Sequence, residues 1–311
     1  MNISSLISSI PGALSQGVLW GMMVLGVYIT FRLLDIADMT CDGSFSLGGC
    51  VCAVLIVNFD VHPALAIVAA VVAGALAGCV TGLLHTFFEI PAILAGILTQ
   101  YSLWSINLRI MGGKSNIPLL KTKTIFSKLV EMTGMRNSTI ALFVGIVIAI
   151  AVVAILYWFF GTELGSALRA TGNNENMIRA LGVNTKKAKM LALMLANALI
   201  ALAGSLVCQS QKYADINMGT GAIVIGLASI VIGEVLFGKF KSFYMILTSA
   251  VVGCCTYFVI RAFVLWLGLD PNDMKLISAI IVALALAAPV ALQKYRTKKA
   301  YSPNGGGTRH A

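Results

Sequence analysis

Side chains that could bind a ligand or a partner gather in three stretches of this chain. Arg32–Ser46 carries three aspartates, Pro91–Met111 carries amides and an indole, and Gly161–Lys189 is a polar, basic island between apolar runs. The three histidines are scattered and match no metal-ligand or catalytic spacing with cysteines or carboxylates. These residue types favour binding over covalent catalysis, and we expect neither catalytic residues nor a metal site.

The amides of Pro91–Met111 share one side if this apolar stretch is helical. Gln100, Trp104 and Asn107 are spaced i, i+4, i+7, which places them on the same face of an α-helix. Amide groups in hydrocarbon cost free energy unless they are paired, so this face should look toward a neighbouring helix or a polar pathway. The spacing leaves two interpretations open at this point: the three residues line a solute pathway, or they brace the helices beside it.

The aspartate-rich stretch Arg32–Ser46 comes directly before Leu47–Val57, an apolar run that is too short to span a membrane alone. Together they predict a broken second membrane helix whose irregular part is tucked inside protein. Asp42, Ser44 and Phe45 stand at the expected break and are candidate pathway residues. The alternative is a cytoplasmic loop that leads into an ordinary short helix.

The basic island Gly161–Lys189 separates two apolar runs, Ile140–Phe160 and Met190–Val207. Each run has roughly the twenty residues that cross a bilayer core as a helix. The island between them must therefore lie in water or against protein.

Two short helices are expected within the island, Glu163–Ala170 and Glu175–Leu181. Gly172–Asn174 has the composition of a turn, and we expect Gly172 to need a positive φ there. Gly182 is the expected C′ residue that ends the second helix. A patterned helix pair held outside the bilayer suits contact with a soluble partner, whereas the alternative is an ordinary basic loop.

Gly233–Lys239 comes close to a phosphate-binding loop, but Phe240 stands where the hydroxyl residue that binds magnesium is required. The preceding element is also expected to be a membrane helix rather than a strand. We therefore expect no nucleotide site and no cofactor on this chain. Glu234 is expected to pair with Lys239 or Lys241 at the cytoplasmic interface, with a proton relay as the alternative.

The elements that position these residues are expected to be membrane helices. Of the 311 residues, 59% are hydrophobic and only 11% are charged, and the mean hydropathy is +0.91. Soluble domains carry about 25% charged residues, so the composition predicts an all-α, polytopic transmembrane bundle. The net charge of +10 is explained by basic residues that collect on the cytoplasmic side, and no basic domain suggests a nucleic-acid partner. The seven cysteines are expected to be small buried hydrophobes.

About nine spans are expected, and the second of them is the broken one. They are Ala13–Phe31, the broken segment within Arg32–Val57, Pro63–Leu84, Pro91–Met111, Ile140–Phe160, Met190–Val207, Thr220–Phe237, Phe243–Leu267 and Met274–Leu292. In the third span, Gly74, Gly78 and Gly82 form a small-xxx-small pattern that lets helices approach closely. Residues 1–295 are expected to form one transmembrane domain, and residues 296–311 a flexible cytoplasmic tail.

The orientation follows from placing the island, residues 162–187, in the cytoplasm. Nine spans then put the N-terminus outside and the C-terminus inside. The five basic residues of the polar loop Gly112–Ser138 fall outside, against the positive-inside rule. The basic residues on the inside are more numerous and closer to the span ends, so this orientation is preferred.

The island also carries a recognisable motif. Gly165, Arg169-Ala170, Gly172-Asn173-Asn174-Glu175, Arg179-Ala180 and Leu181-Gly182-Val183 resemble the coupling loop of ABC importer permeases in the branched-chain amino-acid and ribose permease superfamily. In that family the loop sits in a groove on the cytoplasmic ATPase. The resemblance implies that the ATPase-coupling residues are Glu163, Gly165, Arg169, Ala170, Gly172, Asn173, Asn174, Glu175, Arg179, Ala180 and Gly182.

Four further stretches resemble the permeases ascribed to tryptophan or tyrosine import: Leu33–Gly49, His85–Thr99, Leu98–Leu120 and Gly226–Lys239. With them the resemblance covers residues 13–295. It implies a permease subunit of a bacterial ABC importer in the cell membrane for a small solute. An amino acid is the expected kind of solute, with aromatic amino acids among the candidates, and the sequence does not identify which solute is transported. The implied partners are a second permease copy, a cytoplasmic ABC ATPase dimer and an extracytoplasmic solute-binding protein.

Two other classes stay open. An ion-coupled secondary transporter would need an intramembrane carboxylate or a pair of unwound helices, with internal repeats, and only one candidate break is visible, Asp42–Gly49. A non-transporting membrane assembly protein is the third class, and ATP-driven uptake would exclude it.

Overall fold

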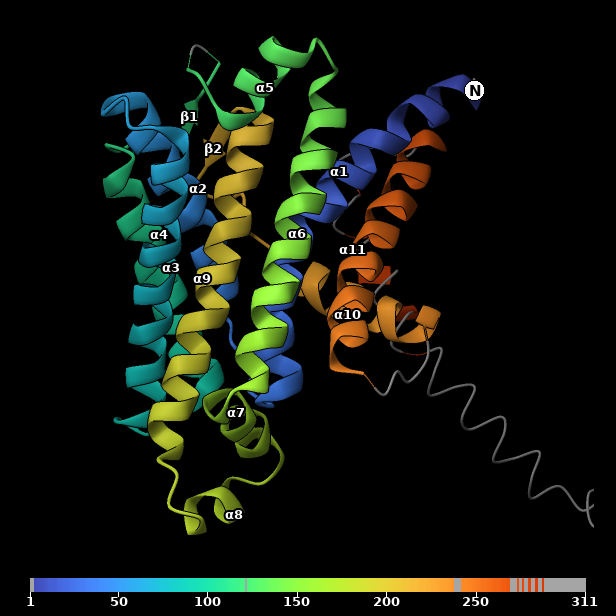
Figure 1. Ribbon diagram of the computed structural model, residues 1–311. Helices are drawn as coiled ribbons and strands as arrows, with labels where there is room; N and C mark the ends of the chain where they lie inside the picture. The colour runs from blue at the N-terminus through green and yellow to red at the C-terminus, as the bar shows by residue number, and fades with distance from the viewer. Residues whose placement is uncertain are drawn as a thin grey trace, which may run out of the picture.

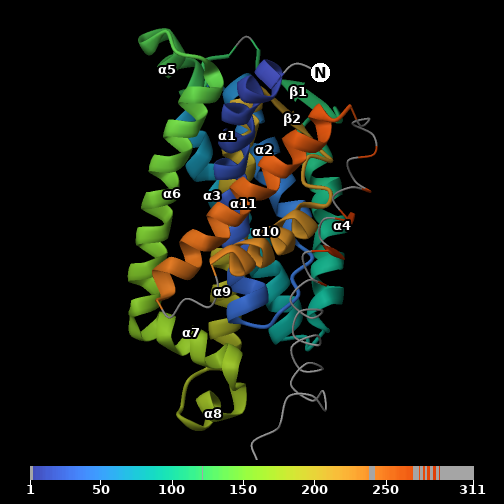
Figure 2. The same ribbon diagram turned by 90° about the vertical axis from the view of Figure 1, so that its right-hand side faces the viewer.

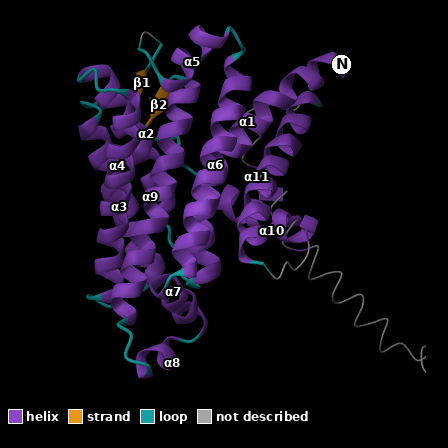
Figure 3. Cartoon of the chain, in the orientation of Figure 1, coloured by secondary structure: helices purple, strands orange, loops and turns teal. Residues whose placement is uncertain are grey.

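The computed structural model describes residues 3–120, 122–237 and 242–268, together with residues 273, 276, 279, 280, 283, 284 and 287. Over these residues the chain is a helical bundle with one short two-stranded ribbon (Figure 1, Figure 3). The elements in chain order are α1 (Ile3–Tyr28), the π-helix η1 (Ile29–Leu33), α2 (Cys41–Asn58), α3 (Pro63–Thr86), α4 (Ala92–Ile110), β1 (Asn116–Pro118), α5 (Ile125–Thr133), α6 (Asn137–Gly161), α7 (Glu163–Asn173), α8 (Glu175–Ala180), α9 (Thr185–Gln211), β2 (Tyr213–Asp215), α10 (Ala222–Phe237) and α11 (Phe243–Trp266). The predicted helical membrane bundle is confirmed.

Six helices among the described residues are long and apolar enough to cross a membrane. They are Ser9–Leu33, Cys41–Asn58, Pro63–Thr86, Asn137–Gly161, Thr185–Gln211 and Phe243–Trp266. The expected count of about nine is therefore not confirmed. The fourth expected span forms the 19-residue α4, whose polar residues Gln100, Asn107 and Arg109 lower its hydropathy, and the seventh forms the 16-residue α10. The ninth expected span falls largely, and the expected tail entirely, outside the described residues.

Helix α1 is the centre of the bundle. Every residue from Gly17 to Thr30 is buried, because α6, α9, α10 and α11 pack around it. Two glycines allow this close approach: a Cβ at Gly17 would lie 2.6 Å from the Cα of Cys255, and one at Gly26 would lie 2.6 Å from the carbonyl oxygen of Ala196. The N-terminal end of α1 and the α7–α8 pair lie at opposite ends of the bundle (Figures 1 and 2).

Helices α3 and α9 pack along each other through the predicted glycine pattern. A Cβ at Gly74 would lie 2.5 Å from the carbonyl oxygen of Asn197, and one at Gly78 would lie 2.3 Å from that of Leu193. Gly82 approaches Met190 in the same way, one turn further along. Small residues thus bring the two backbones together, as the small-xxx-small spacing predicts.

The prediction of a break at Asp42–Phe45 is wrong. Residues Cys41–Asn58 form one continuous α-helix, α2, and the irregular backbone lies before it, between η1 and Thr40. The small residues near the start of α2 favour close packing instead of a break: a Cβ at Gly48 would lie 2.1 Å from the carbonyl oxygen of Ala201 in α9. Ser44 contacts Asn197, near the middle of the 27-residue α9, so α2 begins deep inside the bundle.

Helix α10 also begins inside the bundle, a position that the sequence pattern did not predict. The chain leaves α9 at Lys212, where φ is +60°, and β2 pairs antiparallel with β1 at the register Asn116↔Asp215. It then turns back inward, and a Cβ at Gly219 would lie 2.1 Å from the carbonyl oxygen of Asp42. The chain therefore has two helices that start at bundle depth, α2 and α10.

The polar stretch Gly112–Ser138, expected to be a loop, contains β1 and the amphipathic helix α5. Thr124 and Ser127 form a capping box at the start of α5, and Phe126 is buried below it. The amide of Ile125 donates to the side-chain oxygen of Gln209, which ties α5 to the end of α9.

The cysteines are all free thiols, and five of the seven are buried. The exceptions are Cys79 and Cys255, which are half-buried. The structure thus confirms for five of them the expected role of small buried hydrophobes.

Candidate functional site

The starts of α2 and α10 meet at the side chain of Asp42. The backbone amide of Gly221 donates to Asp42 Oδ2 over 2.8 Å, and the amide of Ile223 donates to Asp42 Oδ1 over 3.0 Å. The hydroxyl of Ser46 accepts from the amide of Gly219 over 3.0 Å. The first amides of a helix lack intrahelical partners, so Asp42 caps α10 from a helix that is distant in sequence.

A pocket of about 150 Å³ opens beside this junction. Four of the six predicted pathway residues line it, namely Asp42 from α2 and Gln100, Trp104 and Asn107 from α4. The other lining residues are Gly43, Ser46, Tyr101, Ile216, Asn217 and Thr220. The structure therefore brings the polar face of α4 against the start of α2 and the turn before α10.

Asn107 is the most deeply buried amide in the pocket lining. Its side chain is 1% exposed, and its Nδ2 donates to the carbonyl oxygen of Gly43 over a long 3.5 Å. Its Oδ1 is buried without a hydrogen-bond partner among the described residues. Trp104, in contrast, is 49% exposed. A buried amide oxygen without a partner is costly and needs an explanation.

The other two predicted pathway residues lie outside this pocket. The Ser44 hydroxyl donates to Asn197 Oδ1 over 2.7 Å, and both residues are fully buried. The Phe45 ring packs on Trp20, with their centroids 4.5 Å apart. Both side chains face the core of the bundle, and their predicted role in a pathway stays a prediction.

A buried polar network before α2 was missed. Asp38 accepts from the Thr40 amide through one oxygen and from Asn197 Nδ2, over 2.8 Å, through the other. The Thr40 hydroxyl shares a hydrogen bond with Thr81 of α3 over 2.7 Å. Asn197 is an amide within the otherwise apolar middle of α9, and that contrast was the available signal.

At the far end of the bundle, α7 and α8 form the predicted helix pair with clear capping. Thr162 caps α7 by accepting from the Gly165 amide, and Asn174 caps α8 by accepting from the Met177 amide over 3.1 Å. Gly182 has φ +86° just after α8, as expected for a C′ glycine.

The expectation for Gly172 is wrong. It lies within α7 without a positive φ, and helix α7 runs on to Asn173 instead of ending at Ala170. Gly172 is needed for space, because a Cβ there would lie 1.7 Å from the carbonyl oxygen of Leu33. Helix α7 therefore rests directly on the backbone where η1 ends.

The predicted coupling residues differ in their exposure. Gly165 is buried against the end of α6, while the half-buried residues are Arg169, Ala170, Gly172 and Glu175. Exposed residues of the set are Glu163, Asn173, Asn174, Arg179, Ala180 and Gly182. The guanidinium of Arg169 lies over the Phe243 ring of α11 at 5.2 Å, so this residue contacts its own chain.

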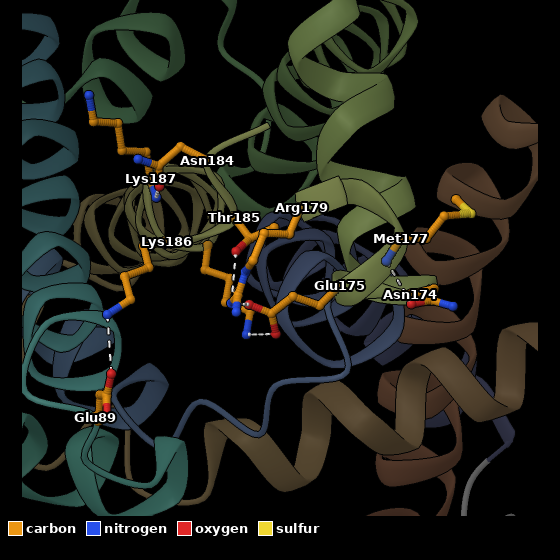
Figure 4. A network of polar contacts seen from close by, with 10 residues as sticks. Glu89, Asn174, Glu175, Met177, Arg179, Asn184, Thr185, Lys186 and Lys187 are labelled. Carbon is orange, nitrogen blue, oxygen red and sulfur yellow. Dashed lines mark hydrogen bonds and ion pairs between the residues drawn. The ribbon is translucent and has the colours of Figure 1, made fainter. Parts of the chain in front are cut away.

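Ion pairs tie α8 to α9, and α9 to the turn after α3 (Figure 4). Glu175 accepts from Lys189 Nζ over 2.6 Å and from Arg179 over 3.0 Å. Lys186 pairs with Glu89, in the turn after α3, over 3.2 Å. The hydrogen bond from Lys189 holds the pKa of Glu175 below its ordinary value of 4.5.

Comparison with known proteins assigns the fold. Residues 9–287 match the family model described as the branched-chain amino acid transport system / permease component. The chain belongs to this permease family. It is 42% identical, over 90% of this chain and 91% of the relative, to the tyrosine transport system permease protein of Clostridioides difficile (strain R20291).

Other relatives of the permease are more distant. It is 24% identical, over 90% of this chain and 85% of the relative, to the ribose import permease protein of Escherichia coli (strain K12). A chain of the solved structure of PsaBC from Streptococcus pneumoniae in complex with Fab shares the fold, with a TM-score of 0.51 and 16% identity, over 91% of this chain and 95% of that chain. The family and the six apolar helices make this chain a multi-pass membrane protein.

Glu234 of the permease forms an ion pair, as expected, but its partner is Arg32 of η1. The Arg32 Nε donates to Glu234 Oε1 over 2.8 Å, and its NH2 group contacts the other carboxylate oxygen. Lys239 and Lys241 lie outside the described residues. The pair joins the end of α10 to the end of η1, close to where α7 packs.

Proposed function

We propose that this permease is the membrane-spanning subunit of a bacterial ABC importer for an aromatic amino acid. A second permease copy completes the pathway, an extracytoplasmic binding protein delivers the solute, and a cytoplasmic ABC ATPase dimer drives the cycle in the bacterial cell membrane. The tyrosine transport system permease, at 42% identity, supports an aromatic amino acid as the solute.

The observation that carries the proposal is the contact between α7 and the chain that leads to the pocket. Gly172 rests on Leu33, and residues Leu34–Thr40 run from there to Asp42. A movement of α7 imposed by an ATPase would therefore act on the segment that positions α2. Alternating access requires a two-state element of this kind, biased by the partner.

The surface of α7 and α8 suits a protein partner. Helices α7 and α8 lie beyond the ends of α6 and α9 (Figure 1). Leu164 on α7, Met177 on α8 and Leu181 directly after α8 are exposed apolar side chains. Charged Arg179 and Glu163 are exposed near them. Apolar anchors with a polar rim are typical of protein interfaces.

The test is ATPase retention and ATP-driven uptake in proteoliposomes with the partner ATPase and binding protein. Leu181 is 72% exposed, so Leu181→Glu should leave the fold intact but lower ATPase retention by about tenfold, as loss of an interface anchor does. Leu120→Glu is the matched control, because Leu120 is 76% exposed and closely follows β1, which lies at the opposite end of the bundle (Figure 1). Equal ATPase retention by both variants would contradict the coupling surface.

The same assay separates the alternative of an ion-coupled secondary transporter. Asp42 is a carboxylate at bundle depth, and α2 and α10 are two helices that begin there, which that alternative requires. In this chain the Asp42 carboxylate accepts hydrogen bonds from the backbone amides at the start of α10. This capping explains both the carboxylate and the helix start without an ion-coupling role. Uptake that needs an ion gradient and no ATP would favour the alternative.

A further inference from the structure

The pocket beside Asp42 has a feature that packing alone does not explain. Asn107 is 1% exposed, lines the pocket, and its Oδ1 has no hydrogen-bond partner among the described residues. A buried acceptor of this kind costs free energy unless something donates to it. Asn107 is one of the residues that line the pocket, so a bound molecule can supply that donor when the amide turns toward it.

The charge of the pocket indicates which kind of hydrogen-bond donor a bound molecule would carry. Among the described residues that line it, Asp42 is the one with a formal charge. The backbone amides of Gly221, Ile223 and Ala222 are directed at its carboxylate, which has about four acceptor sites in all. Asp42 and Asn107 together therefore offer free acceptors, and an ammonium group with three donors suits them.

The other residues of the pocket lining indicate which chemical group the ligand carries next to its ammonium group. Trp104 and Tyr101 are exposed aromatic side chains at the pocket, on the same helix as Asn107. Aromatic faces bind both cations and other rings favourably. A molecule with an ammonium group near an aromatic ring can therefore use both parts of the lining.

We infer that this pocket binds the ammonium end of an aromatic amino acid, with Asn107 Oδ1 and Asp42 as acceptors and Trp104 beside the ring. The inference rests on the proposed function for the choice of solute, and it adds the site and the solute group that is recognised. Asp42 thus has two roles, the cap of α10 and an acceptor for the ligand.

The experiment measures binding to the permease–ATPase complex in nanodiscs, without the binding protein, so that the selectivity of that protein does not contribute. Radiolabelled L-tyrosine is the probe. Its competitors are tyramine, which lacks the carboxylate, and 3-(4-hydroxyphenyl)propionate, which lacks the ammonium group. Tyramine should displace the probe, and the propionate should need a concentration about tenfold higher or more, as expected for a lost hydrogen bond to a charged group.

Three variants test the named residues. Asn107→Leu and Trp104→Ala should each weaken L-tyrosine binding by about tenfold, because one removes the acceptor and the other the aromatic face. Asn137→Leu is the matched control: Asn137 also has a buried Oδ1 without a partner and an Nδ2 bonded to a backbone carbonyl, but it lies at the start of α6, away from the pocket. Its binding should equal that of the unmodified permease.

The outcomes separate this inference from the proposed function. Equal competition by both analogues, or unchanged binding in Asn107→Leu and Trp104→Ala, overturns the inference even where ATP-driven uptake is normal. Absent binding beside normal uptake overturns it as well. Binding that depends on Asn107 and on the ammonium group supports the site, even in a reconstitution that shows no ATP-driven uptake.

Discussion

Gly172 allows α7 to pack closely on the backbone of Leu33. Gly172→Ala should lower the melting temperature, because its Cβ would lie 1.7 Å from the Leu33 carbonyl oxygen and overpacking costs roughly 1–3 kcal/mol. Gly161→Ala is the control, since a Cβ at Gly161 meets nothing within 4 Å. Thermal unfolding of both purified variants checks this, and equal melting temperatures would show that α7 does not rest on Leu33.

We expect the contact between α8 and α9 to be sensitive to acid, because it includes the ion pair between Glu175 and Lys189. The pKa of Glu175 is lowered in the folded state by the hydrogen bond from Lys189, so the contact stabilises the docked helix above pH 4.5. The stabilisation is lost as the pH falls below 4.5 through the folded-state pKa, because protonation removes the charge of the carboxylate. The side chain is 32% exposed, so we expect less than about 1 kcal/mol.

Hydrogen exchange of the α8 amides between pH 3 and pH 6 measures this effect. The pH dependence of α8 protection should disappear in Glu175→Gln. It should persist in Glu163→Gln, because Glu163 is exposed on α7 and forms no ion pair with the described residues. The same pH dependence in Glu175→Gln would assign the acid sensitivity to another group.

At the scale of elements, α2 is a packed helix where a break was expected, and labelling distinguishes the two. Ser44 is fully buried and bonded to Asn197, so Ser44→Cys should resist a water-soluble maleimide in every nucleotide state. Trp104→Cys, at a half-exposed pocket position, should react. Equal labelling rates would mean that the start of α2 opens to water during the cycle.

The sequence predicts the helices well because each long apolar run must pair its own backbone groups in lipid. It also predicts the shared face of Gln100, Trp104 and Asn107, since helical periodicity is local information. The position of the break was wrong because Asp42 and Ser44 find partners in α10 and α9, and no local pattern reports such pairings. The inward turn before α10 was missed because its residues look like an ordinary external loop.

At the scale of the whole molecule, the two ends of the bundle should lie on opposite sides of the membrane. Helices α5 and α7 stand at opposite ends of the bundle (Figure 1). Met132 on α5 and Leu164 on α7 are both exposed. An impermeant maleimide added to intact cells should label Met132→Cys but not Leu164→Cys, and inverted vesicles should show the reverse. Most natural cysteines are buried, which keeps the background low. Labelling of Leu164→Cys in intact cells would contradict the orientation with α7 and α8 in the cytoplasm.

The contact between Asp42 and Gly221 also has a consequence in time, because the two residues are 179 positions apart. A ribosome that adds ~5–20 residues per second reaches Gly221 roughly 9–36 s after Asp42. During that interval the nascent chain contains the Asp42 carboxylate but not yet the backbone amides of Gly221 and Ile223 that donate to it. A chain that stalls before Gly221 therefore keeps the Asp42 carboxylate without these two hydrogen-bond donors, although most of its apolar helices have already been made.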